Sequence, residues 1–178
     1  ALDNAKKNLT SVQDQVTQST ASDRTAVQSA QTALANAQTS LGQAQQVAQA
    51  QVAVQAQDIA KAKNDLYTAQ VNRDAACNPS NNTKSDYQCQ AGNGTVNSAQ
   101  TALDAANAAS AQAAVQSQQS VQSAQAAVDT ATANLKTAQN ALNSDLAKLQ
   151  GNVVTAQASV DQATGALKTA QDLSLIHI

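Results

Sequence analysis

The two cysteines, Cys77 and Cys89, are the residues of this chain whose type and spacing most directly predict chemistry. They bracket the passage "DAACNPSNNTKSDYQCQAGNG", which also holds the only proline. A disulfide between them would stabilise the folded state by about 3 kcal/mol, because it closes a short loop in the unfolded chain. A structural zinc site needs about four ligands, and no histidine lies near these two thiols. We therefore predict a disulfide, no metal, and an oxidising, extracytoplasmic setting.

The residues around the cysteines are typical of a turn. Pro79, the segment "NPSNN" and two glycines at 92 and 94 favour a chain reversal. We expect a tip loop over residues 77–94, with a new helix starting at 95 behind an N-cap at Asn93 or Thr95. Two interpretations of this tip stay open: a solvated turn held in shape by the disulfide, or a contact surface. The distinctive side chains for a contact are Arg73, Lys84, Asp86 and Tyr87.

The composition indicates long thin helices on either side of this tip. Of 178 residues, 41 are alanine, whereas Leu, Ile and Val together number only 30 and Phe is absent. So few large side chains are unusual for a globular core. Disorder is disfavoured, because the net charge is only −2 and Ala and Gln are strong helix formers. The near-neutral charge gives no basic surface of the kind that binds nucleic acid. No apolar run in the sequence is long enough to span a membrane.

Large aliphatic residues recur with heptad spacing along both flanks. The unit Ala-Gln-x-Ala/Ser-Leu/Val appears six times, for example as "AQTAL" at 30 and 99 and as "AQASV" at 156. This spacing predicts a coiled-coil seam in which large residues pack against small ones. The predicted seam residues are Leu9, Val16, Val27, Leu34, Leu41, Ile59, Leu66, Leu103, Val128, Leu135, Leu142, Val153, Val160 and Leu167, and Val52 continues the same series.

The heptad phase slips by four residues at four places. These lie near residues 16–20, 48–52, 117–121 and 149–153. Such stutters relax the supertwist of a coiled coil. If the chain folds back near residue 84 or 85, the first slip faces the last and the two middle slips face each other. We therefore predict an all-α fold, a long antiparallel two-helix coiled-coil hairpin, with helices over 1–76 and 95–172 and a disulfide-closed tip loop.

Two long stretches carry no charge, residues 25–57 and 105–128. One interpretation is a solvated surface of low complexity. The other is side-by-side packing of several hairpins, because amide and small side chains allow close contact without burying charge. Both interpretations stay open.

Catalysis is not expected. The only histidine is His177, and no second nucleophile or base lies near it in the sequence. Carboxylates such as Asp58, Asp65, Asp104 and Asp129 are scattered, without a paired acid cluster or a phosphate-binding loop. We predict a protein that is not an enzyme and that has no cofactor.

The ends of the sequence have features of a fragment. The chain begins at Ala1 without methionine, and the last residues, "LSLIHI" within 173–178, break the Ala-Gln pattern. This tail resembles translated sequencing-adapter read-through, which is not part of a fold. We therefore expect residues 173–178, including His177, to be foreign to the natural protein.

The segments "ALDNAKKNL", "AQTALANAQTSL", "AQAAVDTATANLKTAQNAL" and "AQASVDQATGALKTAQDL" resemble the helical hairpin of membrane-fusion, or periplasmic adaptor, proteins. The resemblance covers residues 1 to about 173. It implies a hairpin inserted between two halves of a lipoyl-like β-domain, anchored at the membrane through flanking sequence. It also implies self-association of hairpins and a membrane transporter as partner, in an efflux or secretion system.

The tip departs from the Gram-negative members of this family. They often carry an Arg, Leu, Ser pattern that docks on an outer-membrane channel, and here Arg73 has no matching Leu and Ser. A cystine-closed tip is more similar to adaptor-type proteins of Gram-positive bacteria, including actinobacteria, that are partnered with an ABC transporter. The alternative function is an extracellular or cell-wall stalk that spaces a binding module. A third, an ice or lipid binder, would expose its large residues instead of placing them in a seam.

Overall fold

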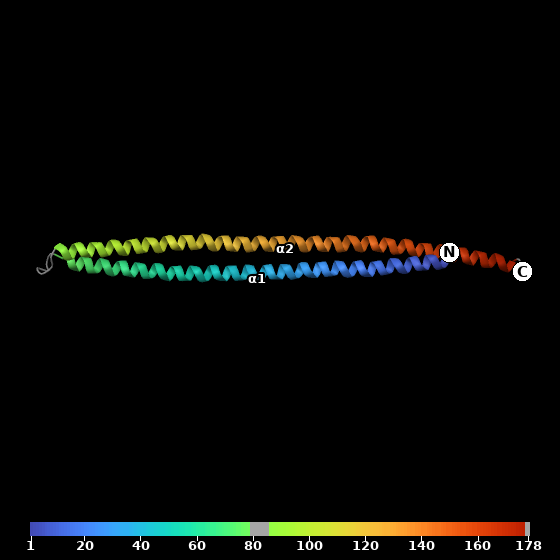
Figure 1. Cartoon of the computed structure of the whole chain (residues 1–178), viewed down its shortest axis with the longest axis horizontal. Coiled ribbons are helices and arrows are strands. Elements are labelled where there is room, and N and C mark those ends of the chain that lie inside the picture. Colours follow the sequence, from blue (N-terminus) through green and yellow to red (C-terminus); the bar gives the residue numbers. More distant parts are fainter. Residues whose placement is uncertain (79–85, 177–178) are drawn as a thin grey trace. The chain divides into compact units, whose positions relative to one another are not determined.

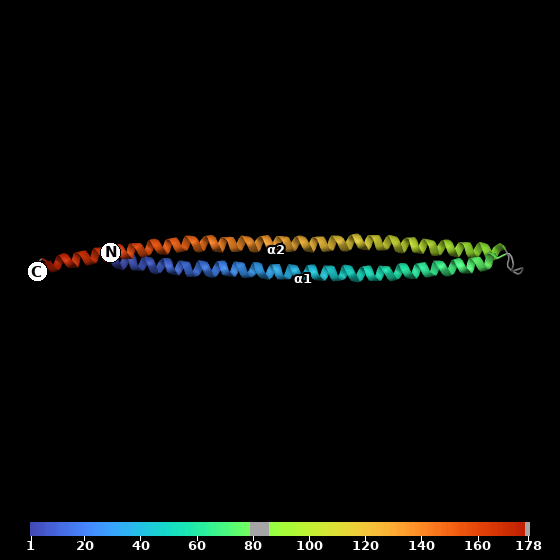
Figure 2. The same cartoon turned by 180° about the vertical axis from the view of Figure 1, so that it is seen from behind.

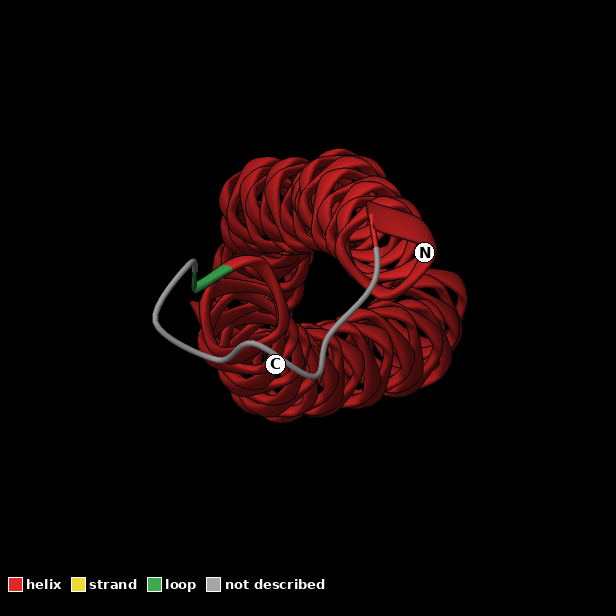
Figure 3. Cartoon of the chain, turned by 90° about the vertical axis from the view of Figure 1, so that its left-hand side faces the viewer, coloured by secondary structure: helices red, strands yellow, loops and turns green. Residues whose placement is uncertain are grey.

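The protein folds into two long helices that pack against each other. A computed structural model describes residues 1–78 and 86–176. Helix α1 spans Leu2–Cys77 and helix α2 spans Asp86–Ile176, and the described residues contain no strand (Figures 1 and 3). A disulfide joins Cys77 to Cys89. The prediction of an all-α, antiparallel two-helix hairpin closed by a disulfide is confirmed.

Threonine and serine side chains are accommodated inside these helices by local hydrogen bonds. Such hydroxyls compete with the backbone for hydrogen bonds, but inside a helix they can donate to the carbonyl four residues earlier. Thr25 Oγ1, for example, donates to the Ala21 carbonyl oxygen at 2.9 Å, and Thr132 Oγ1 donates to that of Val128 at 2.8 Å. Because these hydroxyls are satisfied locally, threonine and serine are tolerated inside the two helices.

Contacts divide the chain into two compact units. Unit 1 comprises Ala1–Ala37 and Val128–Ile178, and unit 2 comprises Gln38–Ala127. In each unit a segment of α1 runs antiparallel beside a segment of α2, which the views from front and back both show (Figures 1 and 2).

Unit 1 has a thin seam whose most buried residues are alanines. Ala131 and Ala156 are buried, and around them the large aliphatic side chains are half-buried. This arrangement places small residues against large ones, so the two helices approach closely. The half-buried members of the predicted seam in this unit are Leu9, Val16, Val27, Leu34, Val128, Leu135, Leu142, Val153 and Val160.

Among the predicted seam residues of unit 1, Leu167 alone is exposed. It lies beside Ala1, Leu2 and Asp3, where α1 begins. Beyond this point no residue of α1 lies opposite α2, so the side chain is only partly covered. Leu167 therefore lies at the edge of the described seam, beside the start of α1.

Unit 2 has the same kind of seam. Ala69 and Ala113 are buried, and the predicted seam residues Leu41, Ile59, Leu66 and Leu103 are half-buried. A hydrogen bond crosses between the helices, from Ser117 Oγ to Gln51 Oε1 at 2.9 Å. This bond is consistent with the fold-back near residue 84 or 85 that the heptad slips predict.

The seam follows an eleven-residue spacing at each slip, as a stutter requires. In unit 2 the covered positions of α1 run through Ala48, Gln51, Gln55 and Ile59, and not through Val52. Val52 is exposed, so its assignment to the seam series is wrong. Across this stutter the seam runs from Ala48 to Ile59 in steps of three, four and four residues. Because the step of three comes first, the seam passes through Gln51, and Val52 lies beside the seam.

The start of α2 differs from the prediction. Residues 86–94 are helical and not part of a tip loop, because α2 begins at Asp86. Thr95 is no N-cap: its Oγ1 donates to the Ala91 carbonyl oxygen at 3.1 Å, within the helix. Asn93 is likewise inside α2. The disulfide is the cause we infer, because it ties Cys89 to the end of α1 and so holds an otherwise poor helical segment. At the other end, α2 continues past the predicted limit of 172 to Ile176.

One polar layer interrupts the seam of unit 1. Thr20 is 9% exposed, and its Oγ1 has no hydrogen-bond partner among the described residues. Asp23 Oδ2 is buried and unpartnered in the same sense. Both residues lie at the first heptad slip, where the eleven-residue spacing carries the seam through Asp23. An unpaired buried polar atom costs about 1–3 kcal/mol, so this layer weakens the unit locally.

Replacing Thr20 by valine is expected to stabilise the protein by about 1 kcal/mol, because valine fills the same space without an orphan hydroxyl. Urea unfolding followed by circular dichroism measures the change. Thr25→Val is the matched control, since the Thr25 hydroxyl is exposed and satisfied by the Ala21 carbonyl. A loss of stability for Thr20→Val would show that its hydroxyl has a partner.

Candidate functional site at the tip of unit 2

The disulfide is placed where the two helices meet the tip. Cys77 is the last residue of α1, and Cys89 lies in the first turns of α2. Their Cα atoms are 4.7 Å apart, and both residues are half-buried. The predicted pairing is confirmed, and among the described residues there is no free cysteine. The bond covalently fixes the distance between the helices at this end of unit 2.

A close approach of the two helices lies next to the disulfide. A Cβ atom built on Gly92 would lie 3.1 Å from Arg73 Cα and 3.2 Å from Arg73 Cβ. A side chain on residue 92 would be in tight contact with Arg73, so the Arg73 backbone would have to shift by a few tenths of an ångström to admit it. Gly92 therefore acts as a packing residue inside a helix, and not as the turn residue predicted from its type.

Gly94→Ala and Gly92→Ala form a matched pair with opposite expected results. Nothing lies within 4 Å of a Cβ on Gly94, so Gly94→Ala should stabilise by about 0.5–1 kcal/mol through helix propensity. In Gly92→Ala the same gain is opposed by the contact with Arg73, so we expect no gain or a loss. Urea unfolding of both variants measures the difference, and equal stabilisation would contradict the close approach.

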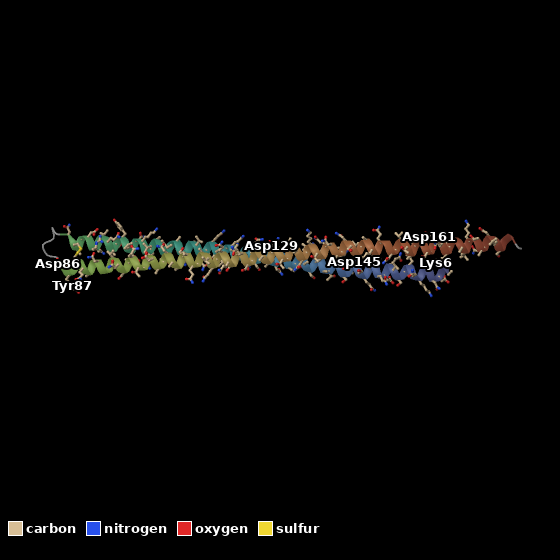
Figure 4. All side chains as sticks on the ribbon, turned by 90° about the horizontal axis from the view of Figure 1, so that it is seen from above. Lys6, Asp86, Tyr87, Asp129, Asp145 and Asp161 are labelled. Atoms are coloured by element: carbon tan, nitrogen blue, oxygen red, sulfur yellow. A yellow bond between two sulfur atoms is a disulfide. The ribbon has the colours of Figure 1, made fainter. Side chains whose placement is uncertain are left out.

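The four predicted contact residues of the tip are not equivalent. Arg73 is half-buried: it packs on Gly92, and its Nε donates to Asp74 Oδ1 at 2.8 Å. Asp86 and Tyr87 are exposed in the first turn of α2 (Figure 4). Lys84 and Pro79 lie outside the described residues, as does His177. The structure thus leaves Asp86 and Tyr87 available to solvent and engages Arg73 within the chain.

Sequence reasoning missed two kinds of exposed side chain in unit 2. Tyr67 is exposed, so both tyrosines of the chain face solvent. Val47, Val52 and Val54 are also exposed, although they are large and apolar. The available signal was that Val47 and Val54 stand outside the heptad series. The sequence does not show which side of the seam each one takes.

The described residues hold no group of three or more His, Cys, Asp or Glu side chains placed to bind a metal. The carboxylates singled out in the sequence are exposed, and Asp104 accepts a hydrogen bond from its helical neighbour Gln100 at 3.0 Å. Across residues 1–78 and 86–176, no helix is apolar over a membrane-spanning length. The site therefore consists of the Cys77–Cys89 disulfide, which we call the clamp, with the exposed residues Asp86 and Tyr87 beside it.

Comparison of this chain with protein-family models, with curated proteins and with solved structures gave no match.

Proposed function

We propose that this chain is the structural, non-enzymatic adaptor hairpin of an extracytoplasmic efflux or secretion assembly. Several copies pack side by side into a conduit above a membrane transporter, for which the sequence resemblance suggests the ABC type. The observation that carries the proposal is the clamp between Cys77 and Cys89, which joins two long helices at their tip. A conduit wall built of hairpins needs long helices whose ends stay together.

The clamp also supports an extracytoplasmic location. Disulfides persist in oxidising compartments and are rare in the reducing cytosol. Anchoring to the membrane is then a task for sequence that flanks residues 1–178. On this proposal the hairpin itself contributes length and a packing surface.

The side chains of the chain suit a structural role better than a catalytic one. A catalytic site needs a nucleophile or a base held beside groups that orient it. The described carboxylates lie apart along two helices, and several pair with a residue on their own helix, as Lys148 Nζ does with Asp145 Oδ1 at 3.3 Å. Most side chains of the seam are alanine and aliphatic residues, which supply packing and no reactive group.

Sequencing the source locus on both sides of this chain tests the proposal. The adaptor function predicts that each flank continues into one half of a lipoyl-like β-domain and that a transporter gene lies alongside. A cell-wall stalk, the alternative function, predicts a wall anchor, further helical repeats or a separate binding domain. The second result would overturn the transport proposal and leave the fold unchanged.

A further inference from the structure

Unit 2 exposes an apolar surface in a region without charge. Residues 38–57 of α1 and 105–127 of α2 carry no charged side chain, and we call them the uncharged pair. The bond from Ser117 to Gln51 shows that these two segments face each other. Val47 is 64% exposed and Val52 is 62% exposed, and Val54 and Val115 are exposed as well. Val47 and Val54 lie on one side of α1 and Val52 on the other, so the exposed valines border two faces of unit 2 and do not form one patch.

The valines lie beside two surface grooves on opposite sides of the seam. One is a shallow groove, open to solvent, that is lined by Val52, Ala114 and Gln118 among others. The second, of about 420 Å³, is lined by Val47, Gln116 and Ser120 among others. Both grooves reach the seam residues Ala48 and Ser117. They form there because the stutter brings small side chains to positions that elsewhere hold leucine or valine.

The two faces carry different side chains. Val52 follows Val47 by five residues, which turns it by about 140° around the helix axis. Val47 and Val54 are seven residues apart and therefore share the other side of α1. Unit 2 thus presents a ridge of two valines on one face and a groove beside Val52 on the opposite face.

We propose that a second copy of this chain occupies this surface, with the Val47 and Val54 ridge of one copy seated in the Val52 groove of the next. This inference rests on the proposed function in one respect: both require that copies of the chain pack side by side.

The identity of the occupant follows from charge and from the packing within unit 2. A charged partner would lose hydration against a surface that offers no counter-charge. An uncharged helix of Ala, Gln, Ser and Val fits, because Gln51 and Ser117 already pair in this way inside the unit. Since ridge and groove lie on opposite faces, the contact is heterologous and can continue from copy to copy as a ring or an open array.

Analytical ultracentrifugation of the oxidised chain over a wide concentration range tests this proposal. We expect reversible self-association of the unaltered protein. Val52→Lys, which blocks the groove, and the double variant Val47→Lys/Val54→Lys, which blocks the ridge, should each weaken association roughly tenfold or more. Lysine is a better helix former than valine, so the variants keep their helices, and circular dichroism checks this.

Val154→Lys is the matched control. Val154 is 64% exposed, like Val47, but it belongs to unit 1 and lies outside the uncharged pair. The Val154→Lys substitution adds the same charge and should leave the association constant unchanged. If Val154→Lys weakens association as much as Val52→Lys does, the surface is not specific and the proposal is overturned.

A mixture of the two blocked variants tests the heterologous geometry. The groove-blocked variant keeps its ridge and the ridge-blocked variant keeps its groove, so the mixture should form a complex that stops at two chains. A mixture that stays monomeric would overturn the ridge-in-groove contact. If the unaltered protein stays monomeric at every concentration, the proposal of self-association is overturned. If locus sequencing instead contradicts the transporter function, the proposal of self-association still stands.

Discussion

Removing the disulfide by Cys77→Ser together with Cys89→Ser should destabilise the protein by about 3 kcal/mol, the largest change expected for this chain. Without the crosslink, which closes a loop across a sequence separation of 12, the unfolded chain regains conformational entropy and is favoured. Thermal and urea unfolding of the two proteins, both followed by circular dichroism, measure the difference.

The loss should be concentrated at the start of α2. Residues 86–94 include Gly92 and Gly94, each of which costs about 1 kcal/mol in a helix relative to alanine. Without the clamp these turns are expected to fray, so amide hydrogen exchange of residues 86–94 should rise more than that of unit 1. The serine variant should not respond to a reducing agent, which separates the role of the bond from other effects of the reagent. Equal melting and equal exchange with and without the bond would show that the clamp does not hold this segment.

Ala156→Leu should have the second largest effect, a loss of about 1–3 kcal/mol. Ala156 is 3% exposed, the most buried residue of the described chain, and it occupies a small position of the unit 1 seam. Leucine adds three carbon atoms where the opposing helix leaves no space, so the helices must separate or adopt strained rotamers. Leucine and alanine have similar helix propensities, so the change reports packing and not helix formation.

Ala158→Leu is the control for this prediction. Ala158 is exposed two residues further along the same helix, so its substitution should change stability by less than about 0.5 kcal/mol. Urea unfolding of both variants gives the comparison. Two variants of equal stability would mean that the seam of unit 1 tolerates large residues, contrary to the packing of small against large that brings these helices together.

Local periodicity was sufficient to predict the fold. A seven-residue repeat with alanine between large residues specifies a helix with one narrow apolar seam, and a seam needs a partner helix to cover it. The positions of the four slips, paired about the Cys77–Cys89 segment, then determine where the chain folds back. The disulfide follows from two cysteines placed on either side of that point. The seam, the fold-back point and the disulfide can each be predicted from the spacing of residues along the chain.

The tip and the stutters could not be predicted in the same way. The residue type of Gly92 favours a turn, yet Gly92 lies inside α2, beside Arg73 and close to the crosslink. Tertiary constraint outweighs local propensity there, because a covalent bond acts on a segment whose own preference is weak.

The surface was decided by tertiary structure as well. Val52 lies four residues after Ala48, a spacing that a seam residue also has, so the sequence does not exclude it from the seam. Only the packing of α2 against α1, with Ser117 bonded to Gln51, directs the seam past Val52 and leaves that valine beside a groove. The sequence alone determined that there is a seam and where it turns back. Which side chains it covers at a stutter depends on the partner helix, because a shift of one residue turns a side chain by about 100° around the axis.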